Sequence, residues 1–96
     1  MSVAIREHVN SLSDDELHEM LRRDYLRRLI RYKTTDELMR KKYGMTYEEF
    51  NSRKVVAERN YSWEVESDSQ DWEMAIDGIR TMERKLKEIN GYPHPY

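Results

Sequence analysis

The sequence predicts an all-α fold, a small bundle of about four helices in one domain. Three observations support this: helix-start signals recur four times, apolar residues repeat at helical spacing, and glycine or proline marks the expected helix ends. With 96 residues, 38% of them charged, and a mean hydropathy of −1.05, the chain has little apolar material for its length. We expect one marginally stable domain over residues 1–90 and a flexible tail over 91–96.

Four capping boxes predict where the helices begin. In this motif a Ser or Thr hydroxyl accepts a hydrogen bond from the amide three residues on, where a Glu or Gln bonds back to the first residue. The four segments are Ser13–Glu16, Thr34–Glu37, Thr46–Glu49 and Ser67–Gln70. Glycine suits the position just after a helix, which predicts ends at Tyr43 and Asn90. We therefore predict helices over 14–33, 36–43, 47–59 and 69–90.

The last predicted helix is long and amphipathic. Its apolar residues form one narrow stripe at helical spacing: Trp72, Ala75, Ile79, Met82, Leu86 and Ile89, with Ile76 at the edge. The first helix is apolar on two sides, because Leu26 and Ile30 point away from the face that carries Leu17 to Tyr32. Another helix or another molecule must cover the second face, and we expect a homodimer.

Residues 61–65 predict a short extended segment. Tyr61, Trp63 and Val65 alternate with polar residues, which is the period of a half-buried strand, and the chain offers no second strand to pair with it. Two interpretations stay open. The segment adds a strand to a partner's sheet, or it is an extended loop that lays Trp63 on the helices.

Charge is distributed unevenly along the chain. Residues 21–42 contain nine basic and three acidic residues, whereas the chain from Thr46 onward contains seven basic and eleven acidic ones. Such asymmetry indicates two surfaces with different partners, one tolerant of polyanions and one attracted to a basic surface. A solvated arginine-rich helix face is the alternative.

The residues that usually carry catalysis do not form a site. His8, His18 and His94 are far apart, there is no Cys, and the three glycines form no phosphate-binding loop. Acid pairs at helix starts are explained by the helix dipole. We predict no catalytic residue, no cofactor and no metal, and hence a non-enzymatic protein. Without Cys, signal peptide or membrane span, we expect a cytoplasmic location.

A DNA-binding regulator is the alternative function. Residues 36–54 match a helix-turn-helix pattern with Met39, Tyr43, Met45 and Phe50 in its core positions. Arg40 and Arg53 depart from that pattern, because a small and an apolar residue usually occupy their positions. The candidate phosphate contacts are Arg22, Arg27, Arg31, Lys33, Arg40 and Lys41. A third interpretation is a structural helical protein that binds no nucleic acid.

Two motifs carry a resemblance to a known family. The run Lys42-Tyr-Gly-Met-Thr-Tyr-Glu-Glu-Phe50 is followed, after a short link and an acidic patch, by Asp71-Trp72-Glu73 at a long helix. This arrangement resembles the small helical antitoxins of prokaryotic type II toxin–antitoxin pairs, particularly the TumA-like group found beside TumE-family toxins. The resemblance covers about residues 34–90 and leaves out the arginine-rich first helix.

The resemblance implies a non-enzymatic protein that neutralises a small basic toxin. Its acidic C-terminal half would be steered to the toxin electrostatically, and large aromatic residues would anchor the interface. On this basis the expected partner-binding residues are Tyr61, Trp63, Val65, Trp72, Ile76 and Ile79.

Overall fold

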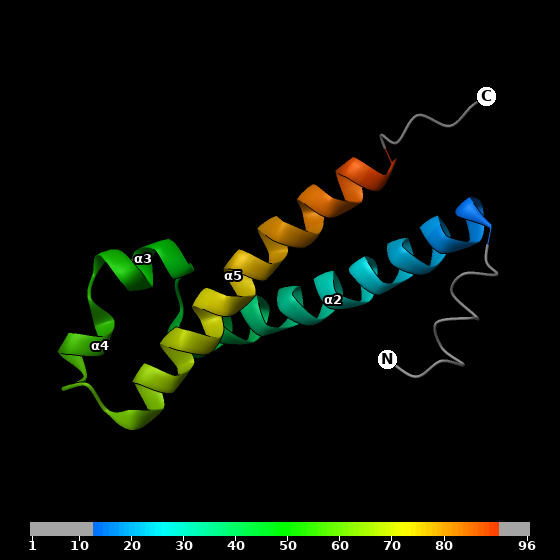
Figure 1. The fold of residues 1–96 in the computed structure, drawn as a ribbon. Helices are drawn as coiled ribbons and strands as arrows, with labels where there is room; N and C mark the ends of the chain where they lie inside the picture. The colour runs from blue at the N-terminus through cyan, green and yellow to red at the C-terminus, as the bar shows by residue number, and fades with distance from the viewer. Residues whose placement is uncertain (1–12, 91–96) are drawn as a thin grey trace.

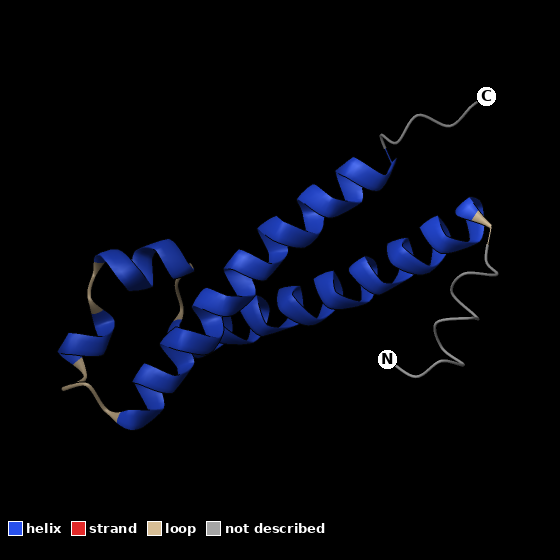
Figure 2. Ribbon diagram, viewed as in Figure 1, coloured by secondary structure: helices blue, strands red, loops and turns tan. Residues whose placement is uncertain are grey.

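The computed structural model describes residues 13–90, and this part of the chain is helical throughout apart from short turns (Figures 1 and 2). It contains α2 (Asp14–Tyr43), α3 (Tyr47–Ser52), α4 (Val55–Glu58) and α5 (Trp63–Asn90), with no strand among the described residues. The predicted all-α class is confirmed. The expected tail over 91–96 lies outside the described residues.

The two long helices, α2 and α5, form an antiparallel hairpin (Figure 1). The short helices α3 and α4 connect them and lie together at one end of the hairpin. The start of α2 and the end of α5 lie at the opposite end (Figure 1). No helix within residues 13–90 has the length and apolar composition that crossing a membrane requires.

A single helix, α2, replaces the two that the sequence predicts over 14–33 and 36–43. Ser13 caps it as expected, accepting a 3.1 Å hydrogen bond from the Glu16 amide. The capping box predicted at Thr34 is wrong. The Thr34 hydroxyl donates to the Ile30 carbonyl oxygen at 2.8 Å, so it bonds back into the running helix and starts no new one. Gly44, at φ 66°, ends the helix where predicted.

The segment after Gly44 contains two short helices where the sequence predicts one over 47–59. The capping box at Thr46 is confirmed, with the Glu49 amide donating to its hydroxyl at 3.2 Å. Lys54 then adopts φ 54°, in the left-handed region, and interrupts the helix. In an unbroken helix Phe50 and Val55 would point about 140° apart. The break allows both side chains to enter the same core.

Helix α5 begins at Trp63, six residues before the predicted start at residue 69. Ser62 lies before its first turn and accepts a 3.4 Å hydrogen bond from the Val65 amide, so the capping box predicted at Ser67 is wrong. The extended segment predicted over 61–65 is also wrong. Tyr61 ends a tight turn at φ 53°, and Trp63 to Val65 form the first turn of the helix.

The core lies where the short helices meet the two arms. Trp72 of α5 is completely buried among aromatic rings, 5.0 Å from Phe50, 5.5 Å from Tyr47 and 5.9 Å from Tyr43 between ring centroids. Its indole Nε1 donates a 2.9 Å hydrogen bond to Asp36 Oδ1 on α2. One side chain of α5 therefore packs on both α2 and α3 while its polar group stays paired.

The rest of the hairpin is a single layer of two helices. The described structure measures 54 × 34 × 17 Å, and none of the 30 residues of α2 is fully buried. In α5 only Ala75 and Met82 are buried beyond Trp72. Gly78 allows the helices to approach closely, because an added Cβ would lie 2.5 Å from ring atoms of Tyr32. Two packed helices cannot enclose a core, so both faces of the hairpin stay open.

We expect Trp72→Ala to remove most of the stability of the domain. Truncation of a buried Trp costs about 3–5 kcal/mol, a large share of the 5–15 kcal/mol of an ordinary domain. Urea denaturation followed by circular dichroism measures the change. The matched control is Trp63→Ala, which should shift the free energy of unfolding by less than about 0.5 kcal/mol because that side chain is 81% exposed.

We expect Gly78→Ala to destabilise the hairpin by about 1–3 kcal/mol, although alanine is the better helix former by about 1 kcal/mol. The new methyl group collides with the Tyr32 ring, which would have to move. Thermal unfolding of Gly78→Ala in the native chain and in a Tyr32→Leu background separates the two effects. If Gly78→Ala stabilises the native chain, the close packing described here is wrong.

Candidate partner-binding surface

An exposed tryptophan stands at the start of α5. Trp63 is 81% exposed, and Tyr61, in the turn before it, is 63% exposed. The turn is fixed by Asn60 and Tyr61, both at positive φ, and by the serine cap of α5. A large apolar ring held in water at a defined place is unusual for a residue type that is mostly buried in folded proteins.

Acidic residues continue from Trp63 along one side of α5. Residues 63–79 contain six acids and no base. Five exposed residues recur at spacings of three and four, which places them on one side of the helix, away from buried Trp72 and Ala75. We name them the acidic stripe: Trp63, Glu66, Gln70, Glu73 and Asp77. Its three acids form no ion pair with any residue in the described part of the chain.

The stripe lies close to the aromatic core. Tyr47 of α3 is half-buried, and burial, together with the nearby charges of Glu73 and Asp77, raises the pKa of its phenol. The negative charges of Glu73 and Asp77 therefore act as far as Tyr47 on α3. A positively charged partner would gain from the field of these charges at long range.

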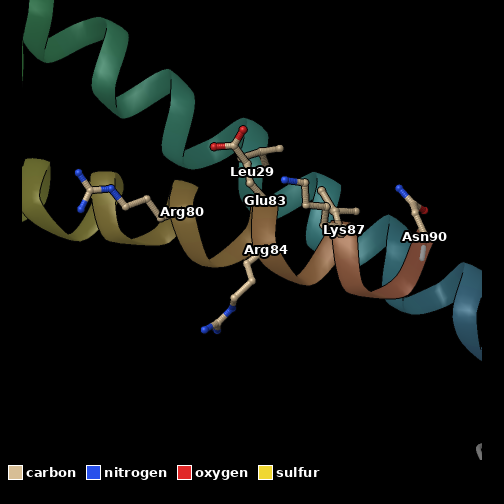
Figure 3. Close-up of a pocket in the computed structure, with 7 residues that line it drawn as sticks. Leu29, Arg80, Glu83, Arg84, Lys87 and Asn90 are labelled. Atoms are coloured by element: carbon tan, nitrogen blue, oxygen red, sulfur yellow. The ribbon is translucent and has the colours of Figure 1, made fainter. Parts of the chain in front are cut away.

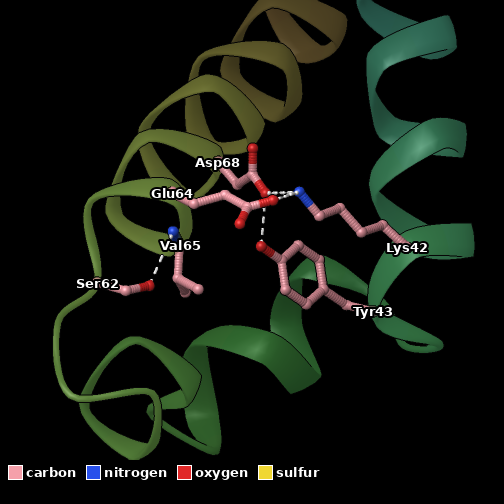
Figure 4. Close-up of polar contacts among 6 residues, drawn as sticks. All are labelled: Lys42, Tyr43, Ser62, Glu64, Val65 and Asp68. Atoms are coloured by element: carbon pink, nitrogen blue, oxygen red, sulfur yellow. Dashed lines mark hydrogen bonds and ion pairs between the residues drawn. The ribbon is translucent and has the colours of Figure 1, made fainter.

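A polar cluster fixes the start of α5 against the end of α2 (Figure 4). Lys42 Nζ donates to Asp68 Oδ2 at 2.6 Å and to Glu64 Oε1 at 2.7 Å. The Tyr43 hydroxyl donates to the same Asp68 oxygen at 2.5 Å. We call this cluster the latch. Because both partners of Asp68 come from the last turn of α2, the latch orients Trp63 and the acidic stripe relative to the core.

Protonation equilibria in the latch follow from these contacts. Burial, together with the hydrogen bond to Asp68, raises the pKa of Tyr43 to about 12. Burial alone would raise the pKa of Asp68, but the hydrogen bonds from Lys42 and Tyr43 outweigh it, and the pKa lies below its ordinary value of 3.8. The same hydrogen bonds, to Asp68 first and then Glu64, raise the pKa of Lys42. At neutral pH the acid and the lysine are therefore both charged.

Two of the predicted partner-binding residues cannot contact a partner in this fold. Trp72 is completely buried and Val65 is buried beside it, because both project from α5 into the aromatic core. Ile76 and Ile79 are half-buried, and Ile76 packs against the same core. Tyr61 and Trp63 are the predicted residues that the structure leaves on the surface.

The sequence prediction assigned electrostatic steering to the acidic C-terminal half as a whole and did not recognise that Glu66, Glu73 and Asp77 share one helix face with Trp63. The signal was present, since Glu66, Glu73 and Asp77 follow Trp63 at helical spacing. It could be recognised only if the helix starts at Trp63, and the assumed start at residue 69 left Trp63 and Glu66 outside the helix.

The predicted nucleic-acid contacts do not gather into one patch. Arg22 is paired with Glu19 at 2.8 Å, and Arg40 with Asp36 at 3.1 Å. The other four are exposed on α2, where helical spacing places Arg27, Arg31 and Lys41 on one side and Lys33 on another. The second helix of the predicted helix-turn-helix, α3, has six residues, with exposed Glu48 and Glu49 and no base.

A groove lies at the far end of the hairpin (Figure 3). Leu29 of α2 lines it with the last turns of α5, where Glu83 and Lys87 lie toward α2 and Arg84 points away from it. It is open, with a volume of about 670 Å³. Among residues 13–90, no three or more His, Cys, Asp or Glu side chains lie close enough together to hold a metal ion.

Comparisons with family models, curated proteins and solved structures find no match to this chain. The function of the chain must therefore be inferred from the geometry of its own residues. Trp63 and the acidic stripe are the features that best indicate the chemistry of a partner.

Acid should weaken the latch. Because folding lowers the pKa of Asp68, its stabilisation is complete above the ordinary value of 3.8 and is lost as the pH falls through the lower folded value. We expect Asp68→Asn to cost about 1 kcal/mol at pH 7, since charge-assisted hydrogen bonds become neutral ones, and to reduce the loss of stability below pH 4.

Urea denaturation between pH 2.5 and pH 7, at intervals of about half a unit, measures both effects. The control is Glu66→Gln, which removes an exposed acid outside the latch and should change the free energy of unfolding at pH 7 by less than about 0.5 kcal/mol. Equal acid sensitivity in native chain and Asp68→Asn would show that other groups govern the acid transition.

Proposed function

We propose that this chain is a non-enzymatic binding protein that neutralises a small basic protein, as the antitoxins of two-protein modules do. One observation carries the proposal: Trp63, 81% exposed, stands at the end of a helical stripe of acids that have no cationic partner in the described chain. The stripe combines a large aromatic anchor with a charge pattern, and these are the two features that dominate protein recognition.

The apolar part of the interaction comes from Trp63. Burial of a large apolar side chain contributes about 1.5–3 kcal/mol of stabilisation. The indole ring of Trp63 does not gain this free energy while it lies in water. Inside the domain, Trp72 already fills the core position, so the fold does not need the second tryptophan there. A pocket on a partner could recover that free energy, and tryptophan is among the residues most enriched at binding hot spots.

The electrostatic part comes from Glu66, Glu73 and Asp77. Toxins that act on RNA carry basic surfaces because their substrate is a polyanion, and the uncompensated acids of the stripe match such a surface. These acids would mainly accelerate association and select the partner, while the aromatic anchor would slow dissociation.

The stripe is also preorganised. It lies on a helix of 28 residues whose start is fixed by the latch and by the burial of Val65 and Trp72. A helix face loses less conformational entropy on binding than an extended loop does. The mode that fits is a rigid helix laid in a basic groove, in place of the added strand that the sequence pattern suggested.

The alternative function, a DNA-binding regulator that uses residues 36–54, stays a prediction with less support. Its second helix presents acids where phosphate contacts would be needed, and two of its six basic candidates are already paired within the chain. A steep salt dependence of operator binding would support this alternative.

The direct experiment is co-expression with the protein encoded beside this chain, followed by sizing of the purified complex. We expect co-purification at a fixed stoichiometry. Trp63→Ala should weaken binding by about 2–4 kcal/mol, the effect of losing a hot-spot aromatic, and leave the helical content unchanged. Asp77→Lys should lower the association rate and reduce its dependence on salt.

The matched control is Glu83→Lys, an exposed acid on the same helix outside the acidic stripe. It should bind nearly as well as the native chain. If Trp63→Ala binds the partner with native affinity, or if no basic partner co-purifies, the proposed function fails.

A further inference from the structure

Much of the hairpin surface is left without a covering layer. The hairpin leaves large apolar side chains of both long helices in water, among them Met20, Ile30, Leu38 and Met74. Its radius of gyration is 18.5 Å, against about 13 Å for a compact domain of this length. Helices in globular proteins owe most of their stability to a packed face, and α2 has no fully buried side chain.

One face of the hairpin carries an apolar groove between the two arms. Leu38 of α2 and Met74 of α5 line it and are 60% and 64% exposed. The less exposed residues that line it come from both arms: Tyr32, Thr35 and Met39 of α2, and Ala75 of α5. Arg31 and Asp71 stand on opposite rims, on α2 and α5 respectively, and neither forms an ion pair with the described residues.

We propose that this groove is covered by the same groove of a second copy of the chain. The two hairpins would then form a four-helix bundle in which α2 of each copy lies over α5 of the other. Leu38 and Met74 of both copies would fill the centre of the bundle, with the arginine and aspartate rims at its edges.

Charge favours a second copy in this arrangement. Residues 31–42 of α2 carry a net charge of +3, and residues 63–79 of α5 carry −6. In the hairpin these segments already lie at the same level, since Asp36 bonds Trp72 and Lys42 bonds Asp68. A two-fold axis parallel to the two arms leaves each residue at the same height along the hairpin in both copies. The basic segment of one copy therefore faces the acidic segment of the other. Stacking α2 on α2 would place like charges together.

The area also suits a dimer. An arm of 28 residues is about 42 Å long, and two adjacent helices are about 20 Å wide, so one face offers about 800 Å². That is the area that each partner contributes to a standard stable interface. A two-fold interface needs one surface that complements itself, and a groove with oppositely charged rims meets that requirement.

Sedimentation equilibrium of the full chain tests the proposal without any other protein. We expect a species of twice 11.8 kDa at micromolar concentration. The double variant Leu38→Glu/Met74→Glu should raise the dissociation constant by about 100-fold or more, because two acids would be buried in each half of the bundle. Its folded monomer should persist, since both side chains are exposed there, and circular dichroism checks this.

The matched control is Ile30→Glu. Ile30 is 65% exposed on α2, like Leu38, but it does not line the groove. It should leave the dimer intact. A native chain that stays monomeric at about 100 μM, or an Ile30→Glu variant that dissociates as readily as the groove variant, would overturn the proposal.

Cross-linking tests the arrangement, because the chain has no native cysteine. A short bismaleimide should link Leu38→Cys to Met74→Cys when the two variants are mixed, and it should link Leu38→Cys to itself far less. Efficient self-linking at position 38 would show α2 lying on α2 and would overturn the arrangement. Trp63→Ala should leave the dimer unchanged, so failure of this inference and failure of the proposed function can be told apart.

Discussion

The structure depends on the burial of Trp72. This residue of α5 lies among the rings of Tyr43, Tyr47 and Phe50, and its indole nitrogen bonds to Asp36, so one side chain joins α5 to both α2 and α3. The aromatic contacts and one paired polar group define how α2 crosses α5. Among the described residues of the arms beyond Trp72, only Ala75 and Met82 are buried, and Gly78 permits the close approach of Tyr32. The stability of the domain is therefore concentrated at the end where the short helices lie.

This concentration explains why so much surface is left for other molecules. A single layer of helices buries one stripe of each and leaves the remaining sides in water. The open sides of this hairpin differ in chemistry. One side of α5 carries the acidic stripe with Trp63, and an adjacent face of the hairpin carries the groove of Leu38 and Met74. In our proposals a basic protein binds the first and a second copy of the chain covers the second.

The sequence was sufficient for the fold class and for the features that local chemistry determines. The caps at Ser13 and Thr46 and the glycine end at Tyr43 were predicted correctly, because each depends on a few adjacent residues. Thr34 and Ser67 carry the same motif inside continuous helices, where tertiary packing overrides the local signal. The interruption at Lys54 serves to bury both Phe50 and Val55, which is a property of the core. For the same reason the sequence could not tell which tryptophan is buried and which is exposed.

The two tryptophans provide the most direct measurement of the central claim, that Trp63 is a binding anchor and Trp72 a core residue. Labelling the chain with 5-fluorotryptophan gives one fluorine resonance for each, assigned with Trp63→Phe. On titration with the unlabelled basic partner, we expect the Trp63 resonance to shift or broaden and to lose its sensitivity to solvent, while the Trp72 resonance keeps its position. A saturable complex that leaves the Trp63 resonance unchanged, or that moves only the Trp72 resonance, would contradict the claim.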